Sequence, residues 1–153
     1  MNISRAQPGD LPRILEIQKE AYLAEAAIYD DYSLPPLLQT LEEIEQEAQT
    51  KVFLKAEEAG QIVGSVRVHL AGDTCYVGRL VVDPKVQRRG IGSALLVEAE
   101  AVFPQATRLE LFTGSRSESN IRLYERHGYS AFRTEALSPS ITLIYMHKQK
   151  LVR

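Results

Sequence analysis

The sequence predicts a mixed α/β domain in which helices flank a central β-sheet. Two patterns support this fold class. Segments whose apolar residues recur at helical spacing alternate with short apolar runs bounded by glycine or proline. In residues 66–70, Val or Leu alternates with Arg or His, which is typical of an antiparallel strand with one covered face. Because the chain has 153 residues, we expect a single domain over residues 1–153.

Seven strands are expected along the chain. Turn signals at Ala59-Gly60 and Gly72-Asp73 separate the second, third and fourth. Apolar runs bounded by such turns place the strands at residues 2–6, 51–57, 61–70, 74–83, 108–113, 129–134 and 140–147.

Four helices are expected between these strands. Asp10 is a suitable N-cap for the first, in which apolar residues recur at helical spacing from Leu11 to Ala24. The loop that follows, residues 29–36, contains two prolines that favour an extended backbone. The other helices are expected at residues 37–48, 91–103 and 120–126.

The most distinctive motif is a basic, glycine-containing turn between an apolar strand and a helix. Gly90 and Gly92 allow the backbone to approach a ligand closely because they lack a Cβ atom. The first turn of the helix offers unpaired N–H groups and the positive end of the helix dipole. Arg88 and Arg89 add positive charge and bidentate donors beside it. The turn is therefore expected to bind a diphosphate.

Two common phosphate-binding loops do not match this turn. A P-loop requires a Gly-Lys pair, and the chain contains none. A dinucleotide-binding fingerprint requires a third glycine where Leu95 stands, although Glu110 falls near the position of its acidic residue. A nucleotide-binding regulatory domain is therefore excluded.

Two segments, the first of which contains this turn, resemble the signatures of one family. Gln87-x-x-Gly90-x-Gly92 follows Val-Val-Asp-Pro, and residues 120–129 run from an Asn through Tyr124 to a Gly-Tyr pair. Together, and in this order and spacing, they resemble the GNAT superfamily of N-acyltransferases. The resemblance covers nearly the whole chain, with residues 20–50 matching only in outline. It implies an α/β (α+β) fold with a mixed, mostly antiparallel sheet of about seven strands flanked by about four helices.

The resemblance implies an enzyme that moves an acetyl group from acetyl-CoA directly to a primary amine of a small molecule or peptide, without a metal. By analogy with the family, Asn120 fixes the pantetheine arm of CoA. The backbone of the preceding strand pairs with the same arm, and the turn holds the pyrophosphate. The strand residues are Leu80, Val81 and Val82, and the turn residues are Gln87, Arg88, Arg89, Gly90, Ile91, Gly92 and Ser93.

The resemblance and the chemistry together assign Tyr124 as the general acid. A tyrosine is protonated at neutral pH and can donate to the departing CoA thiolate. The general base stays open, because the strand at residues 74–80 lacks the Glu of some relatives. Glu110, His69 and an ordered water remain the alternatives. Cys75 is expected to be a small core residue rather than an acyl carrier.

The resemblance places the acceptor amine beside the loop that follows the first helix. Candidate substrate residues there are Tyr29, Asp30 and Tyr32, with Asp31 between them. Carboxylates in this loop would attract a cationic amine. An ordinary solvated polar loop explains the same residues equally well.

Composition limits the possible partners. A formal charge of −2 gives no basic surface for nucleic acid and none for a membrane. One cysteine and no signal-peptide pattern favour a cytoplasmic protein. A monomer and a homodimer both remain open. A CoA-binding module that has lost catalysis and acts in sensing or interaction is the alternative to an enzyme.

Overall fold

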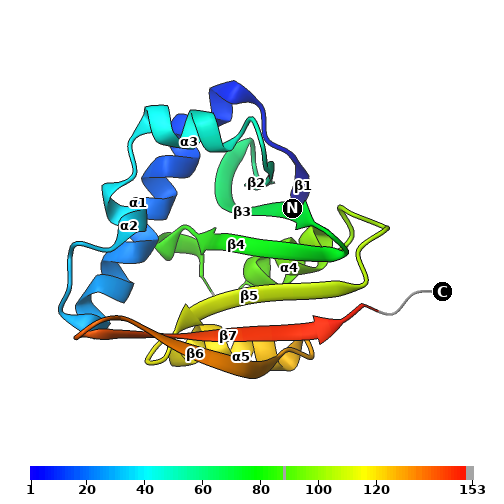
Figure 1. Ribbon diagram of the computed structural model, residues 1–153. Coiled ribbons are helices and arrows are strands. Elements are labelled where there is room, and N and C mark those ends of the chain that lie inside the picture. The colour runs from blue at the N-terminus through cyan, green and yellow to red at the C-terminus, as the bar shows by residue number, and fades with distance from the viewer. Residues whose placement is uncertain (88, 151–153) are drawn as a thin grey trace.

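The computed structural model describes residues 1–87 and 89–150, which form a mixed seven-stranded sheet (Figure 1). The strand order is β1-β2-β3-β4-β5-β7-β6, and every neighbouring pair is antiparallel except β4 with β5. This confirms the predicted fold class. The strands are β1 (Asn2–Arg5), β2 (Val52–Glu58), β3 (Gln61–Ala71), β4 (Thr74–Val82), β5 (Arg108–Gly114), β6 (Ser130–Ser138) and β7 (Ile141–Gln149).

Five helices accompany the sheet in the described residues. The first three gather at one end of the sheet, and the last two lie behind it in the view of Figure 1. None of the helices described is both long and apolar enough to cross a membrane. The helices are α1 (Leu11–Tyr29), α2 (Pro35–Leu38), α3 (Leu41–Glu47), α4 (Ile91–Glu100) and α5 (Glu118–Arg126).

The two faces of the sheet are covered unequally. The main hydrophobic core lies between the sheet and α4 and α5, where Leu95 and Leu109 are almost fully buried. On the other face α1 and α3 pack on β2 through a smaller cluster that includes Ile14 and Phe53. The rest of this second face, over β5, lacks such a cover, and Phe112 is 53% exposed there. Burial of apolar surface therefore fixes the position of the helices but leaves one region of the sheet accessible.

Strands β4 and β5 are paired only where they begin. Their parallel register joins residues 74–76 to residues 108–110. Beyond this point β4 stays paired with β3 as far as Val82, while β5 stays paired with β7 as far as Gly114. The two strands therefore diverge toward the end of the sheet where α1 and α2 lie (Figure 1).

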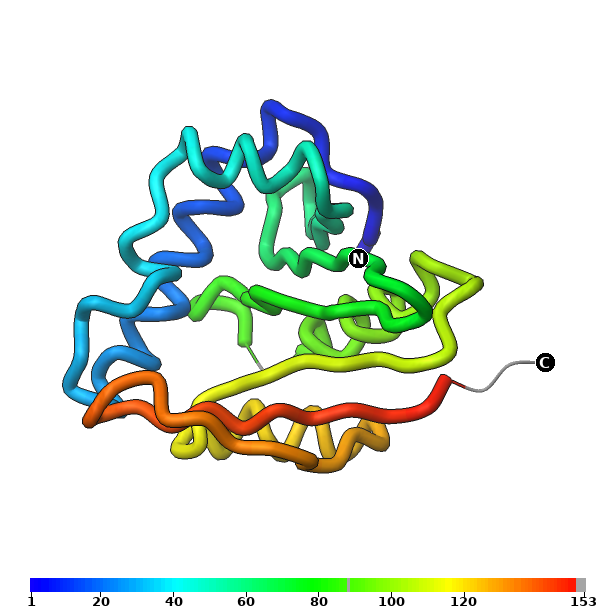
Figure 2. Tube along the Cα trace, in the orientation of Figure 1, coloured from blue at the N-terminus to red at the C-terminus, as the bar shows by residue number. Residues whose placement is uncertain are grey.

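The hairpin of β6 and β7 reaches the loop after α1. Figure 2 shows these two segments, which are far apart in the sequence, side by side at the left. The Ser140 hydroxyl in the hairpin tip donates to an Asp31 carboxylate oxygen at 3.1 Å. Ile141 packs with Ala26, Tyr29 and Leu34. The open end of the β4–β5 gap is thus bordered by α1, α2 and the hairpin.

The second predicted helix is wrong in one respect, because residues 37–48 form parts of two helices. α2 ends at Leu38, and Gln39 takes an extended conformation with ψ at 133°. Thr40 then caps α3 reciprocally: its Oγ1 accepts from the Glu43 N–H at 3.2 Å, and the Glu43 carboxylate accepts from the Thr40 N–H at 2.9 Å. A capping box restarts the helix at this point.

Other boundaries also differ from expectation, and among them α4 ends at Glu100 rather than at residue 103 and β6 continues to Ser138 rather than ending at residue 134. α1 continues beyond Ala24 to Tyr29, and α2 begins at Pro35, so the expected loop at residues 29–36 is shorter. α5 begins at Glu118, which places Asn120 inside the helix rather than at its start.

Candidate acetyl-CoA and amine site

The start of α4 has the geometry of an anion site. Gly90 is the N-cap and has a φ of +76°, a left-handed conformation that glycine adopts without strain. The first helical hydrogen bond runs from the Ala94 N–H to the Gly90 carbonyl at 3.0 Å. In the described chain, the N–H groups of residues 91–93 have no backbone partner and remain available to a ligand. Such an end carries the positive pole of the helix dipole.

The side chains around this helix start connect it to β4 and α5. A Cβ atom at Gly92 would lie 3.6 Å from Leu123 and 3.8 Å from Val82. The Ser93 hydroxyl lies 3.0 Å from Nε2 of His127. Ile91, by contrast, is a buried core residue, so only its backbone can serve a ligand.

The charged and polar part of the turn is exposed. Gln87 points to solvent, and Arg89 forms an ion pair with Glu58 at 3.4 Å. Arg88 lies outside the described residues.

A β-bulge interrupts β4 just before this turn. Gly78 pairs with Arg67 and Val81 pairs with Ser65, so that Arg79 and Leu80 together oppose the single residue 66. Arg79 has a φ of +49°, which costs energy for a non-glycine residue. Bulges redirect side chains at functional sites. Here the bulge lies where β4 separates from β5.

A cavity of about 390 Å³ occupies the space between the diverging strands and the elements that border them. This volume is in the range of small-molecule sites. Five predicted site residues that lie far apart in the sequence line it, which are Tyr29, Leu80, Glu110, Asn120 and Tyr124. Other residues that line it are Tyr22, Glu25, Leu34, Pro36, Glu47, Lys51, Arg67, His69, Tyr76, Arg79, Thr113, Ile141 and Leu143.

Tyr124 presents a protonated phenol to this cavity. Its side chain is 6% exposed and lies edge-on to Tyr129 at a centroid distance of 6.1 Å. Burial raises the pKa of Tyr124, and nearby Tyr22 and Glu25 raise it further. Among the described residues, its hydroxyl has no hydrogen-bond partner. One turn earlier, the Asn120 side chain donates to Thr113 Oγ1 at 3.4 Å and lines the same cavity.

The two candidate bases stand in one row across the sheet. His69 pairs with Tyr76 on the neighbouring strand, and Tyr76 pairs with Glu110. The Glu110 carboxylate accepts from Arg108 at 2.6 Å. The His69 ring stacks on Tyr76 at 5.1 Å, and burial lowers the pKa of His69, with Lys51 nearby adding to the effect. Both side chains border the cavity.

The predicted substrate residues are separated by the fold. Tyr29 lines the cavity, and its hydroxyl lies 2.9 Å from the Ser117 hydroxyl and accepts from the Arg116 N–H at 3.0 Å. Asp30 and Tyr32 are exposed and do not line the cavity. The structure therefore brings only one of the three to the candidate site.

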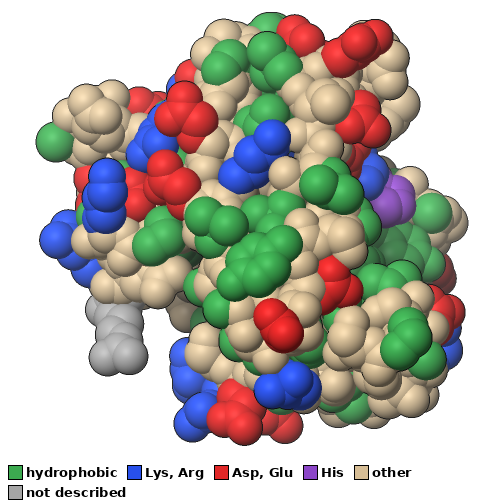
Figure 3. All heavy atoms as spheres, turned by 90° about the vertical axis from the view of Figure 1, so that its left-hand side faces the viewer, with side chains coloured by type: hydrophobic (Ala, Val, Ile, Leu, Met, Phe, Trp, Pro, Cys, Tyr) green, Lys and Arg blue, Asp and Glu red, His purple; other side chains and the backbone are tan. Residues whose placement is uncertain are grey.

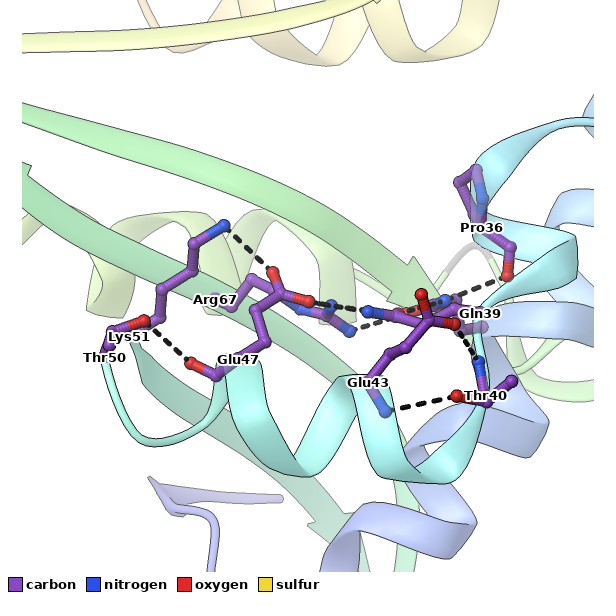
Figure 4. Close-up of polar contacts among 9 residues, drawn as sticks. Pro36, Gln39, Thr40, Glu43, Glu47, Thr50, Lys51 and Arg67 are labelled. Carbon is purple, nitrogen blue, oxygen red and sulfur yellow. Dashed lines mark hydrogen bonds and ion pairs between the residues drawn. The ribbon is translucent and has the colours of Figure 1, made fainter.

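A polar network that the sequence did not reveal forms one wall of the cavity (Figure 4). Arg67 is 2% exposed and lies over the Phe53 ring at 4.4 Å. Its guanidinium donates to Glu47 at 2.7 Å and to Gln18 at 2.5 Å. Lys51 donates to the other Glu47 oxygen at 2.9 Å. Gln18 lies on the apolar face of the helical pattern in residues 11–24, which was an available signal, whereas Arg67 lies on the polar side of the alternation in residues 66–70. The burial of Arg67 corrects the expectation that this strand has only one covered face, and its partners come from distant segments.

A second hollow of about 680 Å³ lies elsewhere, between α4 and β7. Glu100, His127 and Lys148 line it, and a 2.9 Å ion pair joins Lys148 to Glu100. It lacks Tyr124 and Asn120, so the predicted acid and pantetheine ligand belong to the other cavity. Within residues 1–87 and 89–150, no group of three His, Cys, Asp or Glu side chains is arranged to hold a metal ion.

Solved structures with the same fold include one protein that is named an N-acetyltransferase and one that was crystallised with acetyl-CoA. The ribosomal-protein-S18-alanine N-acetyltransferase of Escherichia coli aligns with a TM-score of 0.79 and 18% identity, covering 97% of this chain and 92% of that one. The protein yncA of Salmonella typhimurium, crystallised with its cofactor acetyl-CoA, aligns with a TM-score of 0.73 and 22% identity, covering 97% and 93%. At these identities the likeness shows the fold.

Sequence comparison adds a relative and a family. The curated protein YqkA of Bacillus subtilis (strain 168), named a UPF0157 protein, is 26% identical over 134 residues. That match covers 88% of this chain but only 38% of YqkA. The model of the acetyltransferase (GNAT) family matches residues 11–129. The chain belongs to the GNAT acetyltransferase family, which confirms the family predicted from its two motifs.

Proposed function

We propose that this protein transfers an acetyl group from acetyl-CoA to an amine bound in the cavity between β4 and β5. The observation that carries the proposal is that three features of the fold meet at this cavity. The open N-terminus of α4, the divergence of β4 from β5 and the Tyr124 phenol are joined by residues that line or contact one another. An extended ligand with a diphosphate at one end and a thioester at the other fits this arrangement.

The cofactor residues predicted from the sequence divide into three parts along this path. The turn at residues 87–93 holds the pyrophosphate through its backbone N–H groups, and Arg89 adds positive charge near it. Leu80, Val81 and Val82 offer their backbone to the pantetheine arm, and Asn120 holds that arm from the opposite side. The exposure of the turn and the lining positions of Leu80 and Asn120 support these assignments.

The chemistry follows from the groups that face the cavity. A neutral amine attacks the thioester carbon, the C–N bond forms, and the C–S bond then breaks. The CoA thiolate takes the Tyr124 proton, and the proton that the amine releases restores the phenol. The raised pKa of Tyr124 supports this role because the phenol remains a proton donor at neutral pH.

The amine must first lose a proton, since a free alkylamine has a pKa near 10.4. Of the two candidate bases, Glu110 is held in an ion pair with Arg108. The lowered pKa of His69 keeps its ring neutral and able to accept a proton near pH 7. Activities of Glu110→Gln and His69→Gln, compared with the exposed control Glu45→Gln, separate the two. A variant whose kcat returns to the parental value as the pH rises past about 10.4, where most of the amine is already neutral, lost a base and not a structural group.

The direct test combines binding with turnover. Calorimetry should show acetyl-CoA binding, and release of CoA thiol should depend on an added amine. The panel contains diamines, free amino acids and an alanine-terminated peptide. The peptide is included because the similar E. coli protein is an S18-alanine N-acetyltransferase. Tight acetyl-CoA binding without thiol release for any amine would instead identify a non-catalytic CoA-binding module.

A further inference from the structure

We propose that the acceptor is an amino-carboxylate such as a free amino acid. In this assignment Arg79, assisted by Arg67, binds the carboxylate of the acceptor, and Glu25 lies beside its amino group. The inference rests on the acetyltransferase function proposed above and names its substrate class.

Arg79 is a cavity-lining cation without a protein partner. Its Nη1 atom is buried, and no hydrogen bond reaches it from the residues that the structure describes. No described carboxylate forms an ion pair with it. A buried donor left unsatisfied is costly, so Nη1 of Arg79 is suited to bind an acceptor that enters the cavity. The strained left-handed backbone of Arg79 in the bulge adds to this cost.

Arg67 contributes a second unsatisfied donor on the same wall. Its two Nη atoms are engaged by Glu47, Gln18 and Gln39, but its buried Nε has no partner in the described chain. Burial is the largest cause that lowers the pKa of Arg67 to about 10, and the nearby charge of Arg79 contributes to the lowering. The Arg67 guanidinium therefore stays charged at neutral pH. Two guanidinium groups with free N–H donors favour a planar, bidentate anion such as a carboxylate.

The cavity is lined by three cations and three carboxylates, but Arg79 has no carboxylate partner among the described residues. Arg67 and Lys51 engage both oxygens of Glu47, and Glu110 forms an ion pair with Arg108. The neighbouring His69 has a lowered pKa and adds no charge near pH 7. In a partly buried site an unpaired cation such as Arg79 attracts an anion.

Glu25 supplies the opposite charge on the side of Tyr124. One of its carboxylate oxygens accepts a short hydrogen bond from Ser117, and no cation in the described part of the chain pairs with it. Its charge contributes to the raised pKa of Tyr124 and of Tyr22, which places it near the predicted acid. An acceptor ammonium beside Glu25 is therefore close to the phenol that completes the transfer.

The face of the protein seen in Figure 3 does not provide this selection. Figure 3 views the molecule from the side of α1 and α2, where acidic, basic and hydrophobic side chains are interspersed. The discrimination must occur inside the cavity, where cationic and anionic groups occupy different walls. The remaining wall is apolar and includes Leu34, Ile141 and Leu143, which suits a hydrophobic side chain on the acceptor.

The test measures whether the carboxylate of the acceptor matters. Thiol release with acetyl-CoA is followed for the twenty common L-amino acids, for the C-terminal amides of the three best, and for putrescine and spermidine. The expected kcat/KM is about 10- to 100-fold higher for each acid than for its amide. The α-amino group is less basic in an amino-acid amide than in the free amino acid, so a larger fraction of it is neutral. Chemistry without recognition of the carboxylate would therefore favour the amide.

Two variants locate the effect. Arg79→Asn removes the guanidinium while keeping a residue that tolerates the left-handed backbone, and the acid-to-amide ratio should fall to near one. Arg79→Lys keeps the charge without the planar fork and should give an intermediate ratio. Arg5→Asn, an exposed arginine on the far edge strand β1, should leave the ratio unchanged. Calorimetric titration of CoA-saturated protein with the best amino acid gives a readout that does not depend on turnover.

The outcomes distinguish this inference from the proposed function. Turnover of amides or diamines at equal or greater kcat/KM overturns the inference and leaves acetyl transfer intact. Arg79-dependent binding of an amino acid to the CoA complex without thiol release supports the carboxylate site and overturns catalysis. If no amino acid binds or reacts, or if Arg79→Asn retains the full preference, the inference is wrong.

Discussion

The cofactor side and the acceptor side of the cavity are built in different ways. The pyrophosphate site consists of consecutive residues at the start of α4, and its proposed ligands are mainly backbone N–H groups. The acceptor wall draws side chains from α1, α3, β3 and β4, and its contacts depend on tertiary packing. A site made of local backbone tolerates changes in surrounding side chains, whereas a site made of distant side chains can change specificity through single substitutions.

Gly92→Glu should have the largest effect and act on the cofactor side alone. The carboxylate would stand at the helix start where the phosphates bind, so like-charge repulsion of several kcal/mol should weaken CoA binding by about 100-fold or more. Gly92→Ala is the matched control, because a Cβ atom there makes only ordinary contacts at 3.6 and 3.8 Å. Calorimetry measures both, and circular dichroism checks the fold. Unchanged CoA affinity in folded Gly92→Glu would move the phosphate site elsewhere.

Tyr124→Phe should separate chemistry from binding. The ring and its contact with Tyr129 remain, but the proton is lost, so kcat should fall by about 100-fold, the lower part of the range for general acids. The KD of acetyl-CoA should stay close to that of the parent. The alkaline limb of the pH–rate profile should also shift. Turnover at the parental rate would reduce Tyr124 to a packing residue.

Gly114→Ala should disturb the acceptor side through packing. A Cβ atom at this position would collide with the Tyr29 hydroxyl and ring. Overpacking of this kind typically costs about 1–3 kcal/mol of folding free energy, measured by urea denaturation. The double variant with Tyr29→Leu, which removes the obstructing hydroxyl, should recover part of the loss. Full parental stability in Gly114→Ala alone would contradict the packing seen here.

The Glu47–Arg67 pair should make the acceptor wall sensitive to acid. Burial alone would raise the pKa of Glu47, but Arg67, Lys51 and Gln39 lower it overall. A lowered folded-state pKa gives stability that is present above the unfolded value of 4.5 and is lost as pH falls through the folded value. The stability gap between the parent and Glu47→Gln should therefore narrow below pH 4.5, while the exposed control Glu45→Gln should show no such gap. A gap that is constant with pH would exclude this linkage.

Cys75→Ala should have the smallest effect on activity. Cys75 is fully buried in the core on the α4 side, and burial raises its pKa to about 11, so it is a poor nucleophile. Most activity should remain, and mass spectrometry after incubation with acetyl-CoA should find no acetyl-Cys75. An acetylated Cys75 that passes its acetyl group to an amine would replace direct transfer with a two-step route.

The contrast between the two sides also explains what the sequence could predict. The glycine turn and the Asn120–Tyr124 spacing lie within short segments, so local rules place them on a helix start and one helix face. The partners of Arg67 are separated from it by up to 49 positions along the chain, so linear spacing carries no trace of them. The Thr40–Glu43 capping box is a local signal that would have divided residues 37–48 correctly.

The short pairing of β4 with β5 has a mechanical consequence. Only three residue pairs join the antiparallel block β1–β4 to the antiparallel block β5–β7. The backbone pairing across this junction is therefore shorter than across any antiparallel pair of the sheet, and the core shared with α4 and α5 holds the two blocks together. A pantetheine arm in the gap would act as an additional strand between them. Cofactor bound there would stiffen the junction and favour unfolding of the two blocks as one cooperative unit.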